Sequence, residues 1–197
     1  MKILRAIAVT LALAAPFATQ AATATAVFAG GCFWCMESDF EKLPGVVSAV
    51  SGYSGGHTVN PTYAQSSSGT TGHAESVQVT YDTGKLSYEQ VLDYYWHHID
   101  PLTANAQFCD HGSQYRSAIF YGNEQEHQAA AASKTKFEKQ LGKPIVTEIV
   151  AAGPFYPAED YHQDYYKKNP IRYHYYRHAC GRDDRVKEVW GADAPKD

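Results

Sequence analysis

The chain has 197 residues, 44% of them hydrophobic, and its 17 Lys and Arg against 21 Asp and Glu give a formal net charge of -4. This composition is typical of one globular domain with a sizeable core, and it excludes a strongly basic nucleic-acid binder, because neutralising phosphates requires a basic face. We therefore expect a single domain and no nucleic-acid partner.

The first 21 residues predict a secretory signal peptide. Lys2 and Arg5 precede a short apolar run, and small residues follow up to Ala21. The run is shorter than the roughly 20 residues of a membrane span. We expect cleavage after Ala21 or a neighbouring alanine, which leaves residues 22–197 as a periplasmic or secreted protein with no stable membrane association. An uncleaved N-terminal anchor is the alternative.

The next segment joins a strand to a helix through two glycines. Residues 23–29 form a β-rich run, Gly30 and Gly31 permit a tight turn, and apolar residues then recur at helical spacing until Pro44. Cys32 is therefore expected at the helix start. Unpaired N–H groups and the helix dipole stabilise an anion there and lower a thiol pKa, so Cys32 is a candidate nucleophile.

Strands and helices alternate along the rest of the chain, which predicts an α+β fold, a two-layer α/β sandwich with a mixed sheet. Helices are expected to start at Ser87, which has a capping-box pattern, and at Asn123. Residues 171–197 are polar and aromatic without a clean period, which suggests a C-terminal tail wrapped over the domain. The predicted strands cover residues 46–53, 74–82, 117–121 and 145–151.

Glu75 is a carboxyl on an apolar strand face. It shares parity with Val77, Val79 and Tyr81, and alternate side chains of a strand point the same way. Desolvation would raise the pKa of this carboxyl, as a general acid requires. The alternative is a glutamate at the strand end that reaches solvent or a salt bridge.

Four segments, in this order, resemble the successive signatures of the peptide methionine sulfoxide reductase A family. They are GCFW at residues 31–34, NPTY at 60–63, GHAE at 72–75 and DHGSQYRS at 110–117. The resemblance covers nearly the whole predicted mature domain. It implies a ferredoxin-like form of the two-layer fold and thiol-dependent reduction of methionine S-sulfoxide, free or in proteins, with no cofactor and no metal.

The resemblance also implies how the chemistry is divided. Sulfoxide reduction needs a soft nucleophile for sulfur, which is Cys32, and a proton for the departing oxygen, which Glu75 supplies. The product is methionine plus a sulfenic acid on Cys32, and the S-epimer preference comes from the family alone. The remaining assignments are Tyr63 and Tyr115 as hydrogen-bond donors to the sulfoxide oxygen, Phe33 and Trp34 as an apolar wall around the substrate methyl group, and Asp110 as a residue that orders the pocket.

A second thiol must resolve the sulfenic acid, and two cysteines are candidates. Cys35 replaces a common family glycine and forms a CxxC pair one helical turn from Cys32. Cys180 lies in the C-terminal segment, where family members often carry recycling cysteines, and a relay through both is a third option. We expect a thioredoxin-like reductant and a monomer. Cys109 is expected to be a buried small hydrophobic residue.

Three other interpretations of the cysteines and histidines are compatible with the sequence. A thioredoxin-like dithiol oxidoreductase fits a CxxC that opens a helix, although Glu75 and Tyr115 have no role in dithiol exchange. Four cysteines in an exported chain also permit two structural disulfides. A metal site would use ligand-like residues near the C-terminus, namely His174, His178 and Cys180.

Overall fold

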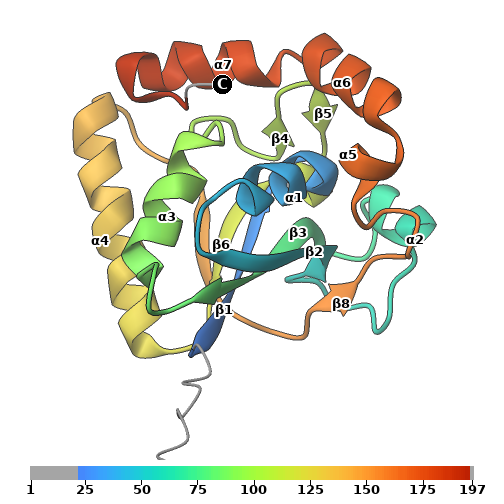
Figure 1. Ribbon diagram of the computed structural model, residues 1–197, viewed down its shortest axis with the longest axis horizontal. Coiled ribbons are helices and arrows are strands. Elements are labelled where there is room, and N and C mark those ends of the chain that lie inside the picture. The colour runs from blue at the N-terminus through green and yellow to red at the C-terminus, as the bar shows by residue number, and fades with distance from the viewer. Residues whose placement is uncertain (1–21, 196–197) are drawn as a thin grey trace, which may run out of the picture.

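The structure is a computed structural model that describes residues 22–195, so the predicted signal peptide lies outside the described residues. Within this part of the chain, no helix combines the length and the apolar character needed to cross a bilayer. The domain is built on one six-stranded sheet (Figure 1). Its strands are β1 (Thr23–Gly30), β2 (Val46–Ser54), β3 (Ala74–Asp82), β6 (Ser117–Tyr121), β7 (Glu148–Ala151) and β8 (Tyr156–Pro157).

Helices lie over the sheet and around its ends (Figure 1). A small separate hairpin of two short strands, β4 (Ala106–Gln107) and β5 (Asp110–His111), precedes a 3₁₀ turn at Ser113–Tyr115. The helices are α1 (Phe33–Glu41), α2 (Tyr63–Ser67), α3 (Tyr88–His97), α4 (Glu124–Leu141), α5 (Tyr165–Lys168), α6 (Pro170–Ala179) and α7 (Arg182–Trp190).

Four strands and two helices form a ferredoxin-like core. The chain order β1-α1-β2-β3-α3-β6 gives the spatial order β6-β1-β3-β2, with each neighbouring pair antiparallel. Strand β8 extends the β2 edge, and β7 joins β6 in parallel after the α4 crossover, as a parallel connection requires. The predicted α+β class with a mixed sheet is therefore confirmed.

The helix boundaries follow the local signals in the sequence. Ser87 accepts a hydrogen bond from the Gln90 N–H and forms the predicted capping box. Asn123 accepts from the Glu126 N–H at the start of α4, and Gly142 ends that helix with φ +63°. Each cap satisfies backbone groups that the helix itself leaves unpaired, typically worth about 1 kcal/mol.

Aromatic side chains fill the space between the sheet and its helices. Phe28 of β1 stacks on Phe40 of α1 at a ring-centroid distance of 5.3 Å and on Tyr95 of α3 at 4.9 Å. All three are buried, and burying one large apolar side chain contributes roughly 1.5–3 kcal/mol. This packing fixes α1 against the sheet, and so fixes the position of the residues at its start.

The C-terminal segment differs from the predicted irregular tail because it is largely helical. Pro170 occupies the first position of α6, where its missing N–H costs nothing. Helices α6 and α7 run across one end of the domain, above β4 and β5 in Figure 1. Trp190 of α7 is buried and donates from Nε1 to the Ile99 carbonyl at 3.0 Å. The segment is thus an integral part of the core.

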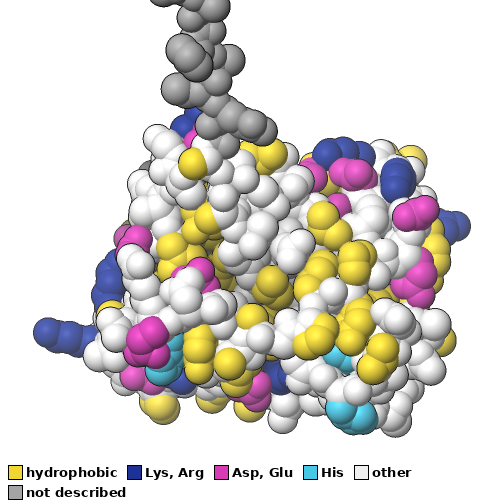
Figure 2. Space-filling view, turned by 90° about the horizontal axis from the view of Figure 1, so that it is seen from below, with side chains coloured by type: hydrophobic (Ala, Val, Ile, Leu, Met, Phe, Trp, Pro, Cys, Tyr) yellow, Lys and Arg dark blue, Asp and Glu magenta, His cyan; other side chains and the backbone are white. Residues whose placement is uncertain are grey.

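Figure 2 shows the face of the domain seen from below, where hydrophobic side chains spread across the middle. Lys, Arg, Asp and Glu lie mostly at the margins of this face, with both signs interspersed. A mixed distribution of this kind creates no concentrated positive field for a phosphate backbone.

Candidate active site

Two glycines place Cys32 immediately before α1. Gly31 has φ +82°, in the left-handed region, and a Cβ there would lie 2.5 Å from Gln107 Cβ. A Cβ on Gly30 would come within 2.6 Å of a neighbouring side chain. Both positions therefore favour glycine. The turn leaves Cys32 as the N-cap residue, with its carbonyl accepting the Cys35 N–H at 3.1 Å.

A cavity of about 70 Å³ opens beside Cys32. Its lining contains all seven residues that were predicted to be catalytic or substrate-binding, although they come from distant parts of the chain. It also contains one residue, Tyr176, that the sequence reasoning missed. The lining consists of Cys32, Phe33, Trp34, Tyr63, Glu75, Asp110, Tyr115 and Tyr176.

Glu75 lies on the helix-covered face of β3, as its parity predicted. Its side chain is only 3% exposed, and its Oε2 accepts the Phe33 N–H at 3.0 Å. Burial raises the pKa of Glu75 to about 8, although the hydrogen bond from Phe33 lowers it. The carboxyl is therefore protonated at neutral pH and can donate a proton into the cavity.

The two cysteines of the CxxC pair are free and buried. Burial raises the pKa of Cys32, which accepts no helix N–H through its sulfur. The hydrogen bond from Cys32 lowers the pKa of Cys35, and the charges of Arg182 and Arg177 lower it further. Burial therefore opposes the low Cys32 pKa that its place at the helix start predicted, and of the two sulfurs it is Cys35 whose pKa falls.

Trp34 is held in place from two sides. Its indole stacks on the Tyr165 ring at 3.7 Å between centroids, with 5° between the planes, and its Nε1 donates to His162 Nδ1 at 3.0 Å. Phe33, the neighbouring wall residue, is buried and packs against the same imidazole at 4.9 Å. Both rings are thus fixed beside Cys32, as an apolar wall for a methyl group requires.

Tyr63 and Tyr115 bring two hydroxyl groups to the cavity. Tyr63 begins α2, and its N–H donates to Glu159 Oε1 at 2.8 Å. Burial raises the pKa of Tyr63 to about 12 and also raises that of Tyr115, with the nearby Glu75 adding to both effects. Both hydroxyls stay protonated at neutral pH and can donate hydrogen bonds to an oxygen in the cavity.

Asp110 and Tyr176 form the remaining wall. The Tyr176 hydroxyl donates a hydrogen bond to Asp110 Oδ2, which joins α6 to the β4-β5 hairpin. Burial raises the pKa of Asp110, whereas the Tyr176 hydrogen bond lowers it. The signal that could have identified Tyr176 is the helical spacing of Tyr173, Tyr176 and Cys180 after Pro170.

The other two cysteines form a disulfide, Cys109–Cys180, which joins the β4-β5 hairpin to the end of α6. Cys109 is exposed, so the prediction of a buried small hydrophobic residue is wrong. A cross-link between residues 71 apart restricts the unfolded chain and typically contributes about 2–4 kcal/mol. Because Asp110 follows Cys109 directly, the disulfide also fixes one edge of the cavity.

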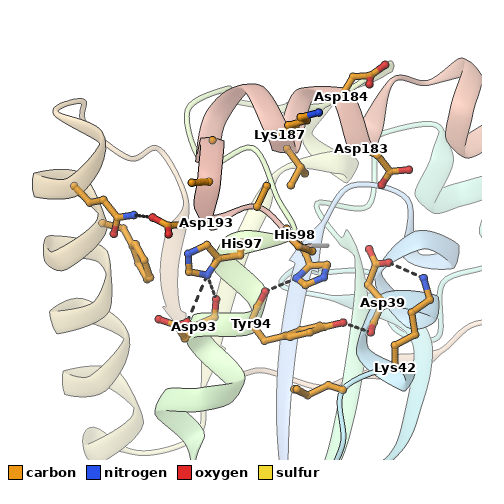
Figure 3. A pocket seen from close by; sticks show the side chains of 18 of the residues that line it. Asp39, Lys42, Asp93, Tyr94, His97, His98, Asp183, Asp184, Lys187 and Asp193 are labelled. Atoms are coloured by element: carbon orange, nitrogen blue, oxygen red, sulfur yellow. Dashed lines mark hydrogen bonds and ion pairs between the residues drawn. The ribbon is translucent and has the colours of Figure 1, made fainter. Parts of the chain in front are cut away.

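A second and larger hollow, of about 1420 Å³, lies between α1, α3, α4 and α7 (Figure 3). We call it the α3–α7 groove. None of the predicted site residues lines it, so the small cavity is the candidate active site. Within residues 22–195, the potential ligand atoms of His174, His178 and Cys180 do not converge on one point.

Comparisons with known proteins agree with this geometry. The sequence model of the family described as peptide methionine sulfoxide reductase matches residues 24–194. The chain belongs to this family. It is 52% identical over 168 residues to the peptide methionine sulfoxide reductase MsrA of Bacillus licheniformis, covering 84% of this chain and 93% of that protein.

Two further relatives extend the comparison with the reductase family. The chain is 54% identical over 178 residues to the MsrA/MsrB peptide methionine sulfoxide reductase of Vibrio cholerae, covering 89% of this chain but only 47% of that longer protein. The solved structure of methionine sulfoxide reductase A of Corynebacterium diphtheriae superposes with a TM-score of 0.69 and 36% identity, covering 78% of each chain.

Proposed function

We propose that this protein reduces methionine S-sulfoxide, free or within proteins, to methionine by thiol chemistry. The observation that carries the proposal is the convergence of Cys32, a protonated Glu75 and two tyrosine hydroxyls in one small cavity. Membership of the reductase family supports the same activity. The cavity supplies what the reaction needs: a sulfur nucleophile, a proton and an apolar wall.

The first half-reaction transfers the sulfoxide oxygen to Cys32. The hydrogen bond between the two thiols lets the Cys32 proton pass to Cys35. The Cys32 thiolate then attacks the sulfoxide sulfur while Glu75 donates its proton to the oxygen and the tyrosines hold that oxygen. The products are methionine, a Cys32 sulfenic acid and an ionised Glu75, so the substrate gains two electrons and Cys32 loses two.

The second half-reaction closes a disulfide between Cys32 and Cys35. The Cys35 sulfur attacks the sulfenic sulfur, an S–S bond forms, the S–O bond breaks, and the oxygen leaves as water with the proton from Cys35. Two observations favour Cys35 over Cys180 for this step: Cys35 is free and one helical turn from Cys32, whereas Cys180 is bonded to Cys109. A thioredoxin-like dithiol then reduces the disulfide.

Serine substitutions separate the two candidate resolving cysteines. We expect Cys35→Ser to release one methionine per protein molecule but to lose at least about 10²-fold in turnover with thioredoxin, thioredoxin reductase and NADPH, because no disulfide forms on which thioredoxin can act. The matched control, Cys109→Ser with Cys180→Ser, should keep turnover within about twofold. Turnover that survives Cys35→Ser and collapses in the control would assign the resolving step to Cys180.

We also propose that the protein is exported and works in an oxidising compartment. The basic and apolar N-terminal segment supports export. The Cys109–Cys180 disulfide, with Cys109 exposed and Cys180 half-buried, is consistent with it, since such bonds persist outside the reducing cytosol. Fractionation of a Gram-negative host that expresses the full chain should give periplasmic protein whose N-terminal sequence starts at Ala22 or close to it. Cytosolic protein that starts at Met1 would contradict export.

A further inference from the structure

Two arginines and one aspartate form a cluster on the same side of α1 as Cys35, in which Asp39 and Arg182 are buried and Arg177 is half-buried. Asp39 lies one helical turn after Cys35 and therefore shares its face of α1. Arg177 of α6 donates from Nη1 to Asp39 Oδ1 at 2.8 Å, and Arg182 Nε, at the start of α7, lies 3.6 Å from Asp39 Oδ2. We call Asp39, Arg177 and Arg182 the Asp39 cluster. The side chain of Asp39 is 3% exposed.

Arg182 is the most buried member of the Asp39 cluster, with a side chain only 2% exposed. Its Nη1 donates to the Gly30 carbonyl at 3.2 Å, and its Nη2 lies 3.0 Å from Met36 Sδ. These two residues flank the segment from Gly31 to Cys35, so the guanidinium lies against that segment. Arginine stays protonated in proteins, so this site always holds a buried positive charge.

The positive charge of the Asp39 cluster is only partly balanced within the domain. Asp39 accepts from Arg177 through Oδ1, and its Oδ2 faces Arg182 Nε in an ion pair at 3.6 Å, too long for a hydrogen bond, so one carboxylate serves both guanidinium groups. Asp183 also binds Arg177, at 2.6 Å, but its side chain is 52% exposed and therefore screened by solvent. Two cations thus face one buried carboxylate, and a buried unbalanced charge is costly.

We propose that the Asp39 cluster holds the sulfur of Cys35 as a thiolate, so that Arg177 and Arg182 act as positioning residues for the resolving step. The proposal rests on the proposed role of Cys35 in closing the disulfide. The thiolate completes the charge balance of the cluster, and no oxidant or reductant beyond those of the proposed reaction is needed. The ionised sulfur also accepts the Cys32 proton at the start of each turnover.

The charges that face Cys35 agree with this assignment. Arg182 and Arg177 lower the pKa of Cys35 beyond the effect of the Cys32 hydrogen bond, whereas Asp39 raises it. Three further titratable groups interact with Cys35, and all three are neutral at neutral pH, so they neither balance the arginines nor repel a thiolate. Glu75 is protonated, and burial raises the pKa of the Tyr173 and Tyr176 hydroxyls, so both stay neutral.

A further neighbour of the Asp39 cluster is also neutral. Burial lowers the pKa of His98, whose backbone carbonyl accepts from Arg182 at 2.9 Å. Figure 3 shows Asp39 at the wall of the α3–α7 groove, with the exposed Lys42 beside it and Tyr94 reaching its backbone. Lys42 Nζ lies 3.7 Å from Asp39 Oδ1, so it offers a solvent-screened cation as a control.

The test titrates Cys35 alone, in Cys32→Ser protein that keeps the Cys109–Cys180 disulfide. Thiolate absorbance in the ultraviolet is followed against pH, with Cys32→Ser/Cys35→Ser as the baseline that removes the tyrosine signal. Adding Arg177→Gln should move the Cys35 midpoint up by about one pH unit, a tenfold loss of thiolate below the midpoint. Adding Asp39→Asn should move it down, and Arg177→Lys should restore it.

Arg177→Gln and Asp39→Asn are expected to shift the Cys35 midpoint in opposite directions, which poor folding of one variant would not produce. Lys42→Gln, which removes an exposed cation next to Asp39, should shift the midpoint far less than Arg177→Gln. Equal shifts in these two variants, or shifts of the same sign for Arg177→Gln and Asp39→Asn in protein with unchanged circular dichroism, would overturn the proposal.

A second readout distinguishes this proposal from the proposed role of Cys35. In protein with native Cys32, dimedone trapping measures how long the Cys32 sulfenic acid survives after one turnover. Its lifetime should lengthen several-fold in Arg177→Gln, because less Cys35 is ionised. A midpoint shift without a longer lifetime would support the electrostatic role of the Asp39 cluster and overturn Cys35 as the resolving residue.

Discussion

Replacing Cys32 with serine is expected to abolish reduction of methionine sulfoxide, with a loss of at least about 10³-fold in kcat/KM under dithiothreitol. Serine keeps the size and hydrogen bonding of the side chain but lacks the soft, polarisable nucleophile that attacks sulfur. The measurement is methionine formed from a sulfoxide peptide. Because dithiothreitol can reduce a sulfenic acid directly, loss of activity in this assay reports the first half-reaction alone.

Two variants serve as controls for Cys32→Ser. Cys180→Ser removes a sulfur that lies outside the cavity, in the disulfide with Cys109, and should retain most of the dithiothreitol-supported activity. Cys35→Ser removes the resolving thiol and the acceptor of the Cys32 proton, so it should slow the oxygen transfer by no more than about tenfold. If Cys32→Ser reduced sulfoxide at a comparable rate to the parent protein, the nucleophile would have to be another residue and the proposed mechanism would fail.

Replacing Glu75 with glutamine is expected to lower kcat/KM by about 10²–10⁴-fold. The amide keeps the shape of the side chain and can accept the Phe33 N–H, but it cannot give a proton to the departing oxygen. The pH profile carries the sharper prediction. Because the pKa of Glu75 is about 8, the activity of the parent protein should fall above that pH as the acid ionises. Glu75→Gln should lack this limb.

The same carboxyl links stability to pH. The pKa of Glu75 rises from 4.5 to about 8 on folding, so between these values the folded protein holds a proton that the unfolded chain has released. The free energy of unfolding therefore falls as pH rises through this window and is level above it. The free energy of unfolding of Glu75→Gln minus that of the parent protein should therefore be about 3 kcal/mol more favourable at pH 7 than at pH 4.5. Urea unfolding at both values measures the gain.

An unchanged stability difference between pH 4.5 and pH 7 would show that Glu75 ionises normally in the folded protein. The same variant would then separate two roles. A large loss of activity without a pH-dependent stability gain would mean that Glu75 acts by its hydrogen bond to Phe33 and not as an acid.

Local patterns in the sequence predicted the parts of the site that local physics controls. Gly30 and Gly31 indicated the turn before α1, and the parity of Glu75 placed its carboxyl on the buried face of β3. The resemblance to the reductase family added Tyr63 and Tyr115, which no periodicity could have distinguished from the other tyrosines.

The features that the sequence did not predict depend on contacts between distant segments. The pKa of Cys32 rises because α6 and β3 bury it, which a helix-start argument cannot anticipate. The Cys109–Cys180 pair spans 71 residues, and Tyr176 reaches the cavity only because α6 packs across it. Tyrosines and arginines lie on both faces of α6 and obscured its helical periodicity of apolar residues. An irregular tail was therefore predicted for this segment.

The most direct test of the proposed function offers the purified protein, with dithiothreitol, peptides that carry either the S or the R epimer of methionine sulfoxide. We expect methionine from the S epimer only, and none from either epimer in Cys32→Ser. If a folded protein reduced neither epimer but reduced insulin disulfides, the CxxC pair would serve dithiol exchange and the proposed function would be wrong.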